Sequence, residues 1–341
     1  MNDGRQKNGD ENSDDEFMKL WLEYYNAVIV EERKKGDYGY FWEGEHVTLK
    51  FGSDSKDSWE KTTFGDNVTY LDIHNESSND VGKVNDTNLV KINSISKLGY
   101  IGINRMPVSG AGFKALTNLK NLKCINIKAA QPLSKLFEHV HNFPDLRNMY
   151  IYESKLSYPN WRNLLKNDKL KSLCCNGCSL TDDDLASFPS HPNIDSLYFQ
   201  NNDLTCLNFS FIKDMPQLKM IDIWGNHRFN IEGLRILTEA GQNTLMDICF
   251  QDSPLIDDSC IKYFLPMEKI QTISFTKTNI TEKGLEQLKD IPTLRYLFLP
   301  DQISVEFVKD LQEKYMPQCH FMWSSEHTKD LVAIELSEDY D

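Results

Sequence analysis

The most reactive-looking segment of this chain is Cys174-Cys175-Asn176-Gly177-Cys178. The C-x-x-C spacing of its second and third cysteines is that of half a zinc site or of a redox-active pair. A structural zinc ion takes four ligands, and the sequence contains no second C-x-x-C and no H-x-x-x-H to complete the set. We therefore expect neither a metal ion nor any other cofactor.

Motifs of known catalytic sites are absent from the sequence. There is no H-E-x-x-H, G-x-S-x-G, P-loop or G-x-G-x-x-G motif. The eight histidines are scattered, and we expect each to be solvated or to cap a turn rather than to act as a general base. Asp182, Asp183 and Asp184 follow Thr181, which predicts a helix start with an N-cap and favourable carboxylates. We therefore expect no catalytic residues and no enzyme activity.

A repeating apolar pattern explains the cysteines better than metal binding does. The pattern is L-x-x-L-x-L, with Ile, Met, Phe and Cys also accepted, and it returns every 24 residues over six units, then at steps of 27, 25 and 24. Cys175 holds a core letter, whereas Cys178 holds the ninth place, which suits a small polar side chain that bonds to the turn backbone. The units begin at Leu98, Leu122, Leu146, Leu170, Ile194, Leu218, Leu245, Ile270 and Leu294, and a degenerate copy has Cys319 and Met322.

A second apolar pattern, with helical spacing, lies between the strand signals of each unit. Gly284, Leu285 and Leu288 are an example. A Pro or polar break precedes most strands and ends the helix of the previous unit. One unit is therefore a strand, a turn and a short helix. Because a single unit cannot bury its apolar face, about ten units must stack into a solenoid.

The segment 278–288 reads T-x-I-T-x-x-G-L-x-x-L and resembles the unit of bacterial leucine-rich-repeat proteins with helices on the outer face. The resemblance covers roughly residues 65–325. It departs from the family pattern at 204–215, which lacks the Gly-Leu pair, and at 129–132. It implies an α/β leucine-rich-repeat solenoid with a curved parallel sheet on the concave face and short helices on the convex face. It says little about function, because the shared letters are core positions.

The segments outside the repeats are short. Residues 16–64 contain apolar residues at helical spacing and then alternating aromatic and polar residues, which predicts a helix and a hairpin that cap the first repeat. A separate partner-binding module is the alternative. The acidic tails 1–15 and 326–341 are expected to be disordered. The start lacks the basic and apolar run of a secretory signal, and the eight cysteines have no even spacing, so we expect a cytoplasmic protein without a membrane segment.

The letters between the core residues of each strand should face the concave side, because successive side chains of a strand point to opposite faces. These positions are rich in aromatic and poor in basic residues. Tyr and Trp dominate interface hot spots, which predicts a partner-binding strip. The alternative is that the aromatic residues only stabilise the sheet. The predicted binding residues are Tyr150, Tyr152, Tyr198, Trp224, Tyr296, Phe298 and Trp323, with Asp222 and Asp247 as charge partners for an Arg or Lys.

Charge restricts the class of partner. The chain has 51 acidic and 37 basic side chains, a formal charge of −14, which disfavours nucleic acid and favours a neutral or basic partner. The sequence thus predicts a non-catalytic protein–protein interaction module. Two alternatives are an inhibitor or immunity-type protein that neutralises a basic toxin or enzyme, and an effector or scaffold subunit of a larger complex.

Overall fold

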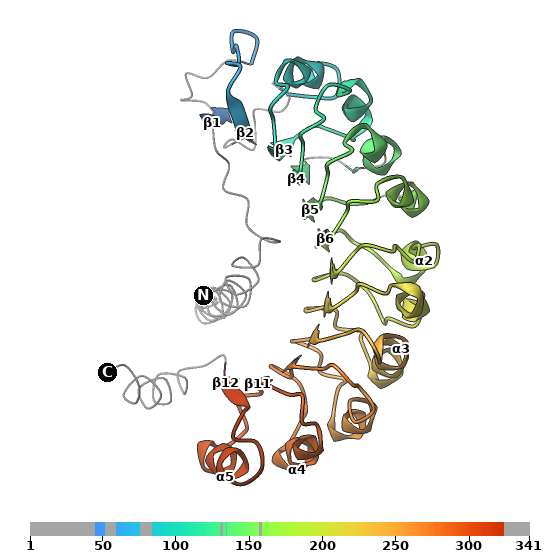
Figure 1. Ribbon diagram of the computed structural model, residues 1–341, viewed down its shortest axis with the longest axis vertical. Helices are drawn as coiled ribbons and strands as arrows, with labels where there is room; N and C mark the ends of the chain where they lie inside the picture. Colours follow the sequence, from blue (N-terminus) through green and yellow to red (C-terminus); the bar gives the residue numbers. More distant parts are fainter. Residues whose placement is uncertain are drawn as a thin grey trace, which may run out of the picture.

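A computed structural model describes residues 45–51, 59–75, 84–129, 132–133, 135–156 and 159–323. In these residues twelve strands form one sheet, and its strands follow one another in chain order. Every pair of neighbouring strands is parallel. The strands line the inside of an arc and the helices line its outside (Figure 1). The fold is the predicted leucine-rich-repeat solenoid.

The strands become shorter along the chain, from eight residues in β2 to three in β7. Their bounds are β1 Glu45–Phe51, β2 Val68–Asn75, β3 Tyr100–Met106, β4 Cys124–Ala129, β5 Asn148–Tyr152, β6 Ser172–Asn176, β7 Ser196–Tyr198, β8 Met220–Asp222, β9 Asp247–Cys249, β10 Thr272–Ser274, β11 Tyr296–Leu299 and β12 His320–Trp323.

Most outer segments are 3₁₀ helices rather than α-helices. A 3₁₀ helix rises about 2.0 Å per residue, against about 1.5 Å for an α-helix, so it spans the outer side of a short unit with fewer residues. The long helix α3 lies in the unit with the longest step, where Met220 pairs with Asp247. The bounds are η1 Leu89–Ser94, η2 Ala111–Ala115, η3 Leu136–Asn142, η4 Trp161–Lys166, α2 Asp182–Leu185, η5 Phe209–Asp214, α3 Ile231–Gly241, η6 Asp258–Tyr263, α4 Glu282–Glu286, η7 Gln287–Asp290 and α5 Val305–Tyr315.

The repeating apolar letters form the core between the sheet and the helices. Strand partners from Tyr100 to Met220 are 24 residues apart at each step. Every core letter of the six units that begin at Leu98 is at most 1% exposed. Apolar surface buried in this way stabilises a fold by about 25 cal/mol per Å². The predicted register of these units is confirmed.

The last repeat differs from the prediction by one residue. The repeat pattern predicts Met322 in the core and Trp323 on the concave face, but Leu297 pairs with Phe321 and Leu299 pairs with Trp323. Leu297 and Leu299 are core residues, so Trp323 faces the core as well. It is 1% exposed, and its indole nitrogen donates to a backbone carbonyl at 3.2 Å. The prediction of Trp323 as a partner-binding residue was wrong, because a degenerate copy could not set the register.

The sheet begins before the first predicted repeat. β1 pairs in parallel with β2, so residues 45–51 of the predicted cap form a strand of the solenoid sheet. The predicted cap helix, the other strand of the predicted hairpin and both acidic tails lie outside the described residues.

In seven of the units the strand is followed by a sharp turn that contains a left-handed residue. The residue just before the ninth place has a positive φ in seven units, and Gly177 and Gly225 are the two glycines among them. A Cβ on Gly225 would lie 2.2 Å from Oδ1 of Asn201, so the close approach of two units also requires glycine there. The other five residues are Arg105, Glu153, Asn201, Asp252 and Lys277.

Asn202, at the ninth place of its unit, joins its own turn to the preceding one. Oδ1 of Asn202 accepts hydrogen bonds from the backbone N–H groups of Cys178 and Leu180, each at 3.0 Å. Its Nδ2 donates to the carbonyls of Cys175 at 2.8 Å and Phe199 at 3.0 Å. The buried turn groups therefore find partners without regular secondary structure.

Cys178 fills the same place with a thiol. Its Sγ donates to the carbonyls of Ile151 at 3.4 Å and Asn176 at 3.5 Å. The predicted role of Cys178 in the turn is confirmed. Cys175 is a fully buried core residue, as predicted.

The Asp182–Asp184 run also has a structural role. Thr181 and Asp184 form a capping box at the start of α2, as the sequence predicted. Asp182 bonds to the next unit instead, where its carboxylate accepts from Oγ1 of Thr205 at 2.7 Å and from the N–H of Cys206 at 3.0 Å. These carboxylates hold consecutive units together on the outer side.

We predict that Asn202→Ala lowers the free energy of unfolding by about 2 kcal/mol or more, because buried turn groups lose their partners. Asn121→Ala is the matched control. Its amide makes one exposed hydrogen bond, to Ser96, and the expected loss is below about 0.5 kcal/mol. Urea denaturation of both variants measures the difference. Equal losses in the two variants would show that the ninth-place bonds do not hold the turns together.

Candidate binding site on the concave face

The middle of the concave face carries an apolar cluster that is separate from the core. Cys174, Tyr198 and Met220 are buried there, and Tyr150 and Tyr152 pack against them half-buried. The rings of the last two lie 6.4 Å apart at 19°. The hydroxyl of Tyr198 donates to Sδ of Met220 at 3.3 Å. The structure thus brings together three of the predicted tyrosines, from β5 and β7.

The other predicted aromatic residues lie further along the same face. Trp224 follows β8 and is half-buried, and its indole N–H is buried without a hydrogen-bond partner in the described residues. Tyr296 and Phe298 belong to β11. Tyr296 stacks on His320 with ring centroids 5.3 Å apart, whereas Phe298 is only 3% exposed. The predicted strip is therefore a central cluster and a second group near the C-terminal end of the sheet.

Asp222 lies at the fifth place of its unit, one of the predicted concave positions, but it is not an exposed charge partner. It is 3% exposed, and its carboxylate accepts hydrogen bonds from Nε2 of Gln200 at 2.5 Å and from the N–H of Trp224 at 3.0 Å. Burial raises the pKa of Asp222 to about 6, although these hydrogen bonds lower it. The expectation that it presents a surface charge was wrong. Asp247 is half-buried at the start of β9.

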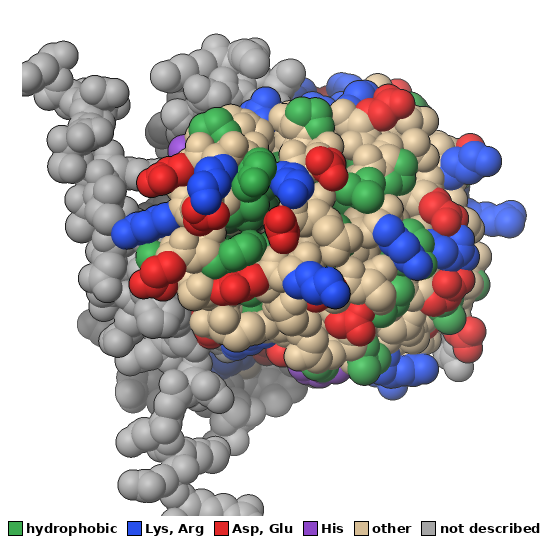
Figure 2. All heavy atoms as spheres, turned by 90° about the horizontal axis from the view of Figure 1, so that it is seen from below, with side chains coloured by type: hydrophobic (Ala, Val, Ile, Leu, Met, Phe, Trp, Pro, Cys, Tyr) green, Lys and Arg blue, Asp and Glu red, His purple; other side chains and the backbone are tan. Residues whose placement is uncertain are grey.

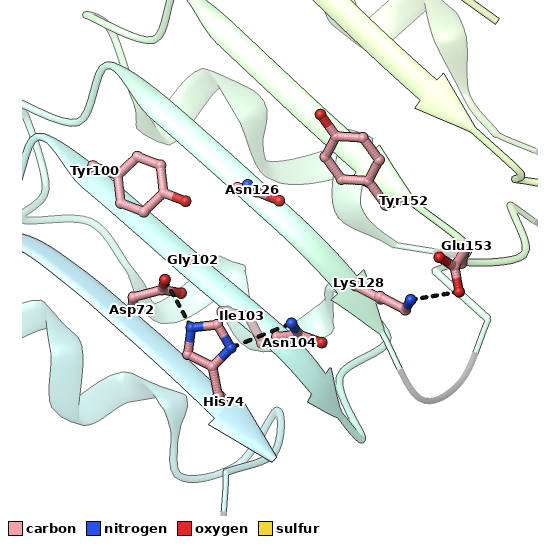
Figure 3. Close-up of a pocket in the computed structure, with 10 residues that line it drawn as sticks. All are labelled: Asp72, His74, Tyr100, Gly102, Ile103, Asn104, Asn126, Lys128, Tyr152 and Glu153. Atoms are coloured by element: carbon pink, nitrogen blue, oxygen red, sulfur yellow. Dashed lines mark hydrogen bonds and ion pairs between the residues drawn. The ribbon is translucent and has the colours of Figure 1, made fainter. Parts of the chain in front are cut away.

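A hollow of about 290 Å³ lies on the same face near its N-terminal end (Figure 3). Strands β2 to β5 and the turn after β5 supply its walls. Its lining is mainly polar, unlike the central cluster. The lining residues are Asp72, His74, Tyr100, Gly102, Ile103, Asn104, Asn126, Lys128, Tyr152 and Glu153.

Three side chains form a hydrogen-bonded chain across one wall of the hollow. Nε2 of His74 lies 2.8 Å from Oδ2 of Asp72, and Nδ1 of His74 lies 3.3 Å from Nδ2 of Asn104 (Figure 3). A neutral histidine that donates from Nε2 accepts at Nδ1, so the two contacts fit one tautomer. These two contacts hold the three side chains in fixed positions relative to one another.

Gly102 makes room for this arrangement. A Cβ on Gly102 would lie 2.1 Å from Oδ1 of Asp72, so any other residue would displace the carboxylate. Beside it, the rings of Tyr70 and Tyr100 stack in parallel with centroids 4.2 Å apart. Burial, with the nearby Tyr70 and Asp72, raises the pKa of Tyr100 well above its ordinary value, so its hydroxyl stays neutral.

On the other side of the hollow Lys128 forms an ion pair with Glu153. The predicted binding residues do not include Asp72, His74, Asn104 or Lys128, because the prediction rests on the aromatic content of the concave positions. The available signal was that they occupy the fifth and seventh places of successive units, the same columns that hold Tyr150 and Tyr152.

The surface around α5 has a different character. Figure 2 shows acidic and basic side chains interspersed on this end of the arc, with scattered hydrophobic residues between them. Such a mixed surface is typical of a solvated face.

The described residues contain neither a metal-binding cluster nor a membrane-spanning helix. In this part of the chain no group of three His, Cys, Asp or Glu side chains could hold a metal ion. No helix within the same ranges is long and apolar enough to cross a membrane. All eight cysteines are buried free thiols.

Comparisons with known proteins add little. No protein-family model and no curated protein matches the sequence. Among solved structures, the crystal structure of an internalin from Listeria monocytogenes is similar, with a TM-score of 0.41 and 16% sequence identity over 75% of this chain and 80% of that chain. So distant a similarity carries no argument about function, and the fold rests on the sheet and its register.

We predict that Asp222 makes stability depend on pH. A carboxyl whose pKa is higher in the folded state stabilises the fold below its unfolded value of 3.8, and this contribution is lost as pH rises through about 6. Its full size is at most about 3 kcal/mol. The difference in unfolding free energy between the parent and Asp222→Asn should therefore favour the parent more at pH 4 than at pH 7. Guanidinium titrations at both pH values measure it, and a difference independent of pH would contradict the assignment.

Proposed function

We propose that this chain is a non-catalytic protein-interaction module of the bacterial leucine-rich-repeat type, and that it binds its partner protein on the concave face. The observation that carries the proposal is the central cluster, in which Tyr150 and Tyr152 cover a buried patch on the side of the sheet that faces away from the core.

The cluster has the properties of an interface hot spot. Tyrosine side chains offer large contact areas, and a half-buried ring has already lost part of its rotamer freedom. The sheet beneath them is held by hydrogen bonds on both sides of β5 and β6, so a partner would meet a surface that is already ordered. Trp224 is half-buried at the seventh place of its unit, the place that Tyr152 holds in an earlier unit.

The charge of the chain favours a basic partner. The formal charge of −14 would speed the approach of a cationic surface. Added salt would weaken this attraction, because it screens the charges. Neutralisation of a basic toxin or enzyme is a special case of this proposal. Binding to a partner of that kind should weaken strongly between low and high ionic strength.

The proposal is tested with a double variant, Tyr150→Ala/Tyr152→Ala. Both side chains are half-buried, so their loss should leave the fold intact. We expect the parent chain to capture a discrete partner from host lysate and the variant to bind it at least about tenfold more weakly, since hot-spot truncations cost 2 kcal/mol or more. Quantitative pull-down followed by mass spectrometry measures both.

The matched control is Tyr315→Ala on the convex helix α5, a tyrosine that is 51% exposed. It removes the same side chain from the opposite side of the arc and should leave capture unchanged. If the control loses the partner and the concave double variant keeps it, the convex face is the binding surface and the proposal fails.

A further inference from the structure

The hollow near the N-terminal end of the concave face holds an unused hydrogen-bond acceptor. Oδ1 of Asn104 is buried and has no hydrogen-bond partner in the described residues. Figure 3 shows this oxygen turned away from His74. A buried acceptor without a donor costs about 1 to 3 kcal/mol, so such a group in a native fold calls for a partner.

The orientation of the Asn104 amide follows from its neighbours. In the histidine tautomer that donates from Nε2 to Asp72, Nδ1 of His74 accepts from Nδ2 of Asn104, and the 2.8 Å and 3.3 Å contacts fit this arrangement. The amide therefore directs its N–H toward the histidine and its oxygen elsewhere. Reversal of the amide would place two acceptors against each other.

The hollow also has an excess of negative charge. Asp72 and Glu153 are carboxylates, whereas Lys128 supplies one positive charge, which is already paired with Glu153. An anion would meet two carboxylates and a paired lysine, whereas a cation with several N–H groups would meet acceptors.

A guanidinium group fits these walls best. It is planar, it carries five N–H donors and it stacks on aromatic rings, and the ring of Tyr152 forms one wall of the hollow. The ammonium of lysine offers three donors from a single point and is more strongly hydrated. The hollow and the central cluster share Tyr152, so a single partner could contact both.

We propose that the hollow binds an arginine side chain of the partner protein, which donates hydrogen bonds to Asn104 and to the carboxylate of Asp72. This inference rests on the proposed function, because it assumes a protein partner on the concave face. It adds the residue type that the partner must present at this end of the sheet.

The test uses the full chain and N-acetyl-arginine methylamide as the probe, with N-acetyl-citrulline methylamide as the uncharged probe of the same shape. Binding is followed by the ¹⁵N and ¹H shifts of backbone amides in β3 and β4. We expect saturable shifts with the arginine probe, with a dissociation constant in the millimolar range, and at least about tenfold weaker binding of citrulline.

Two variants should change the affinity for the arginine probe in opposite directions. Asp72→Asn should weaken the binding of the arginine probe about tenfold, because a charge-assisted bond is lost. Lys128→Met should strengthen it several-fold, because it removes a like charge and releases Glu153. General damage to the fold cannot produce an increase in affinity, so Lys128→Met decides the matter even if Asp72→Asn unfolds.

Three results would overturn the inference: no saturable shift with the arginine probe, equal binding of both probes, or binding of inorganic phosphate that is lost in Lys128→Met. The last would make the hollow an anion site. Each is separable from failure of the proposed function, because partner capture and its loss in the Tyr150→Ala/Tyr152→Ala variant are measured without these probes.

Discussion

The structure depends on side chains, such as Asn202, that satisfy backbone groups at the turns that follow the strands. A strand of three residues, such as β7, leaves most of its unit outside regular secondary structure, and buried N–H and C=O groups there need partners. Asn202 bonds to two N–H groups and to carbonyls in its own and the preceding unit. Consecutive turns are thereby tied together, and the spacing of the units follows.

This constraint decides which residues are free for function. The stacking of units restricts the residue types at the core positions and at the ninth place. The alternate positions of each strand, which face the concave side, are free of this restriction. Two regions of that face differ in character: the apolar cluster of Tyr150, Tyr152 and Tyr198, and the polar hollow around Asp72 and Asn104. A partner that spans them would combine hydrophobic anchoring with a specific polar contact.

Periodicity was sufficient to predict the fold, because Leu98 and its counterparts recur at a constant spacing and each is buried. It failed where the spacing signal was weak, and Trp323 was placed on the wrong face for that reason. The position of Asp222 on the concave side was predicted correctly. Its burial was not, and the buried carboxylate accepts a hydrogen bond from Gln200 in the preceding unit. The pairing of Gly102 with Asp72 follows from the repeat register. The contacts of His74 with Asp72 and Asn104 do not, because they depend on side-chain conformations that the repeat leaves open.

The central claim, that the partner binds on the concave face, is tested most directly by hydroxyl-radical footprinting of the chain with and without its captured partner. We predict that oxidation of Tyr150, Tyr152 and Trp224 falls on complex formation, whereas oxidation of Tyr315 on α5 does not change. Protection confined to Tyr315 and other residues of the convex helices, with the concave tyrosines unchanged, would contradict the account.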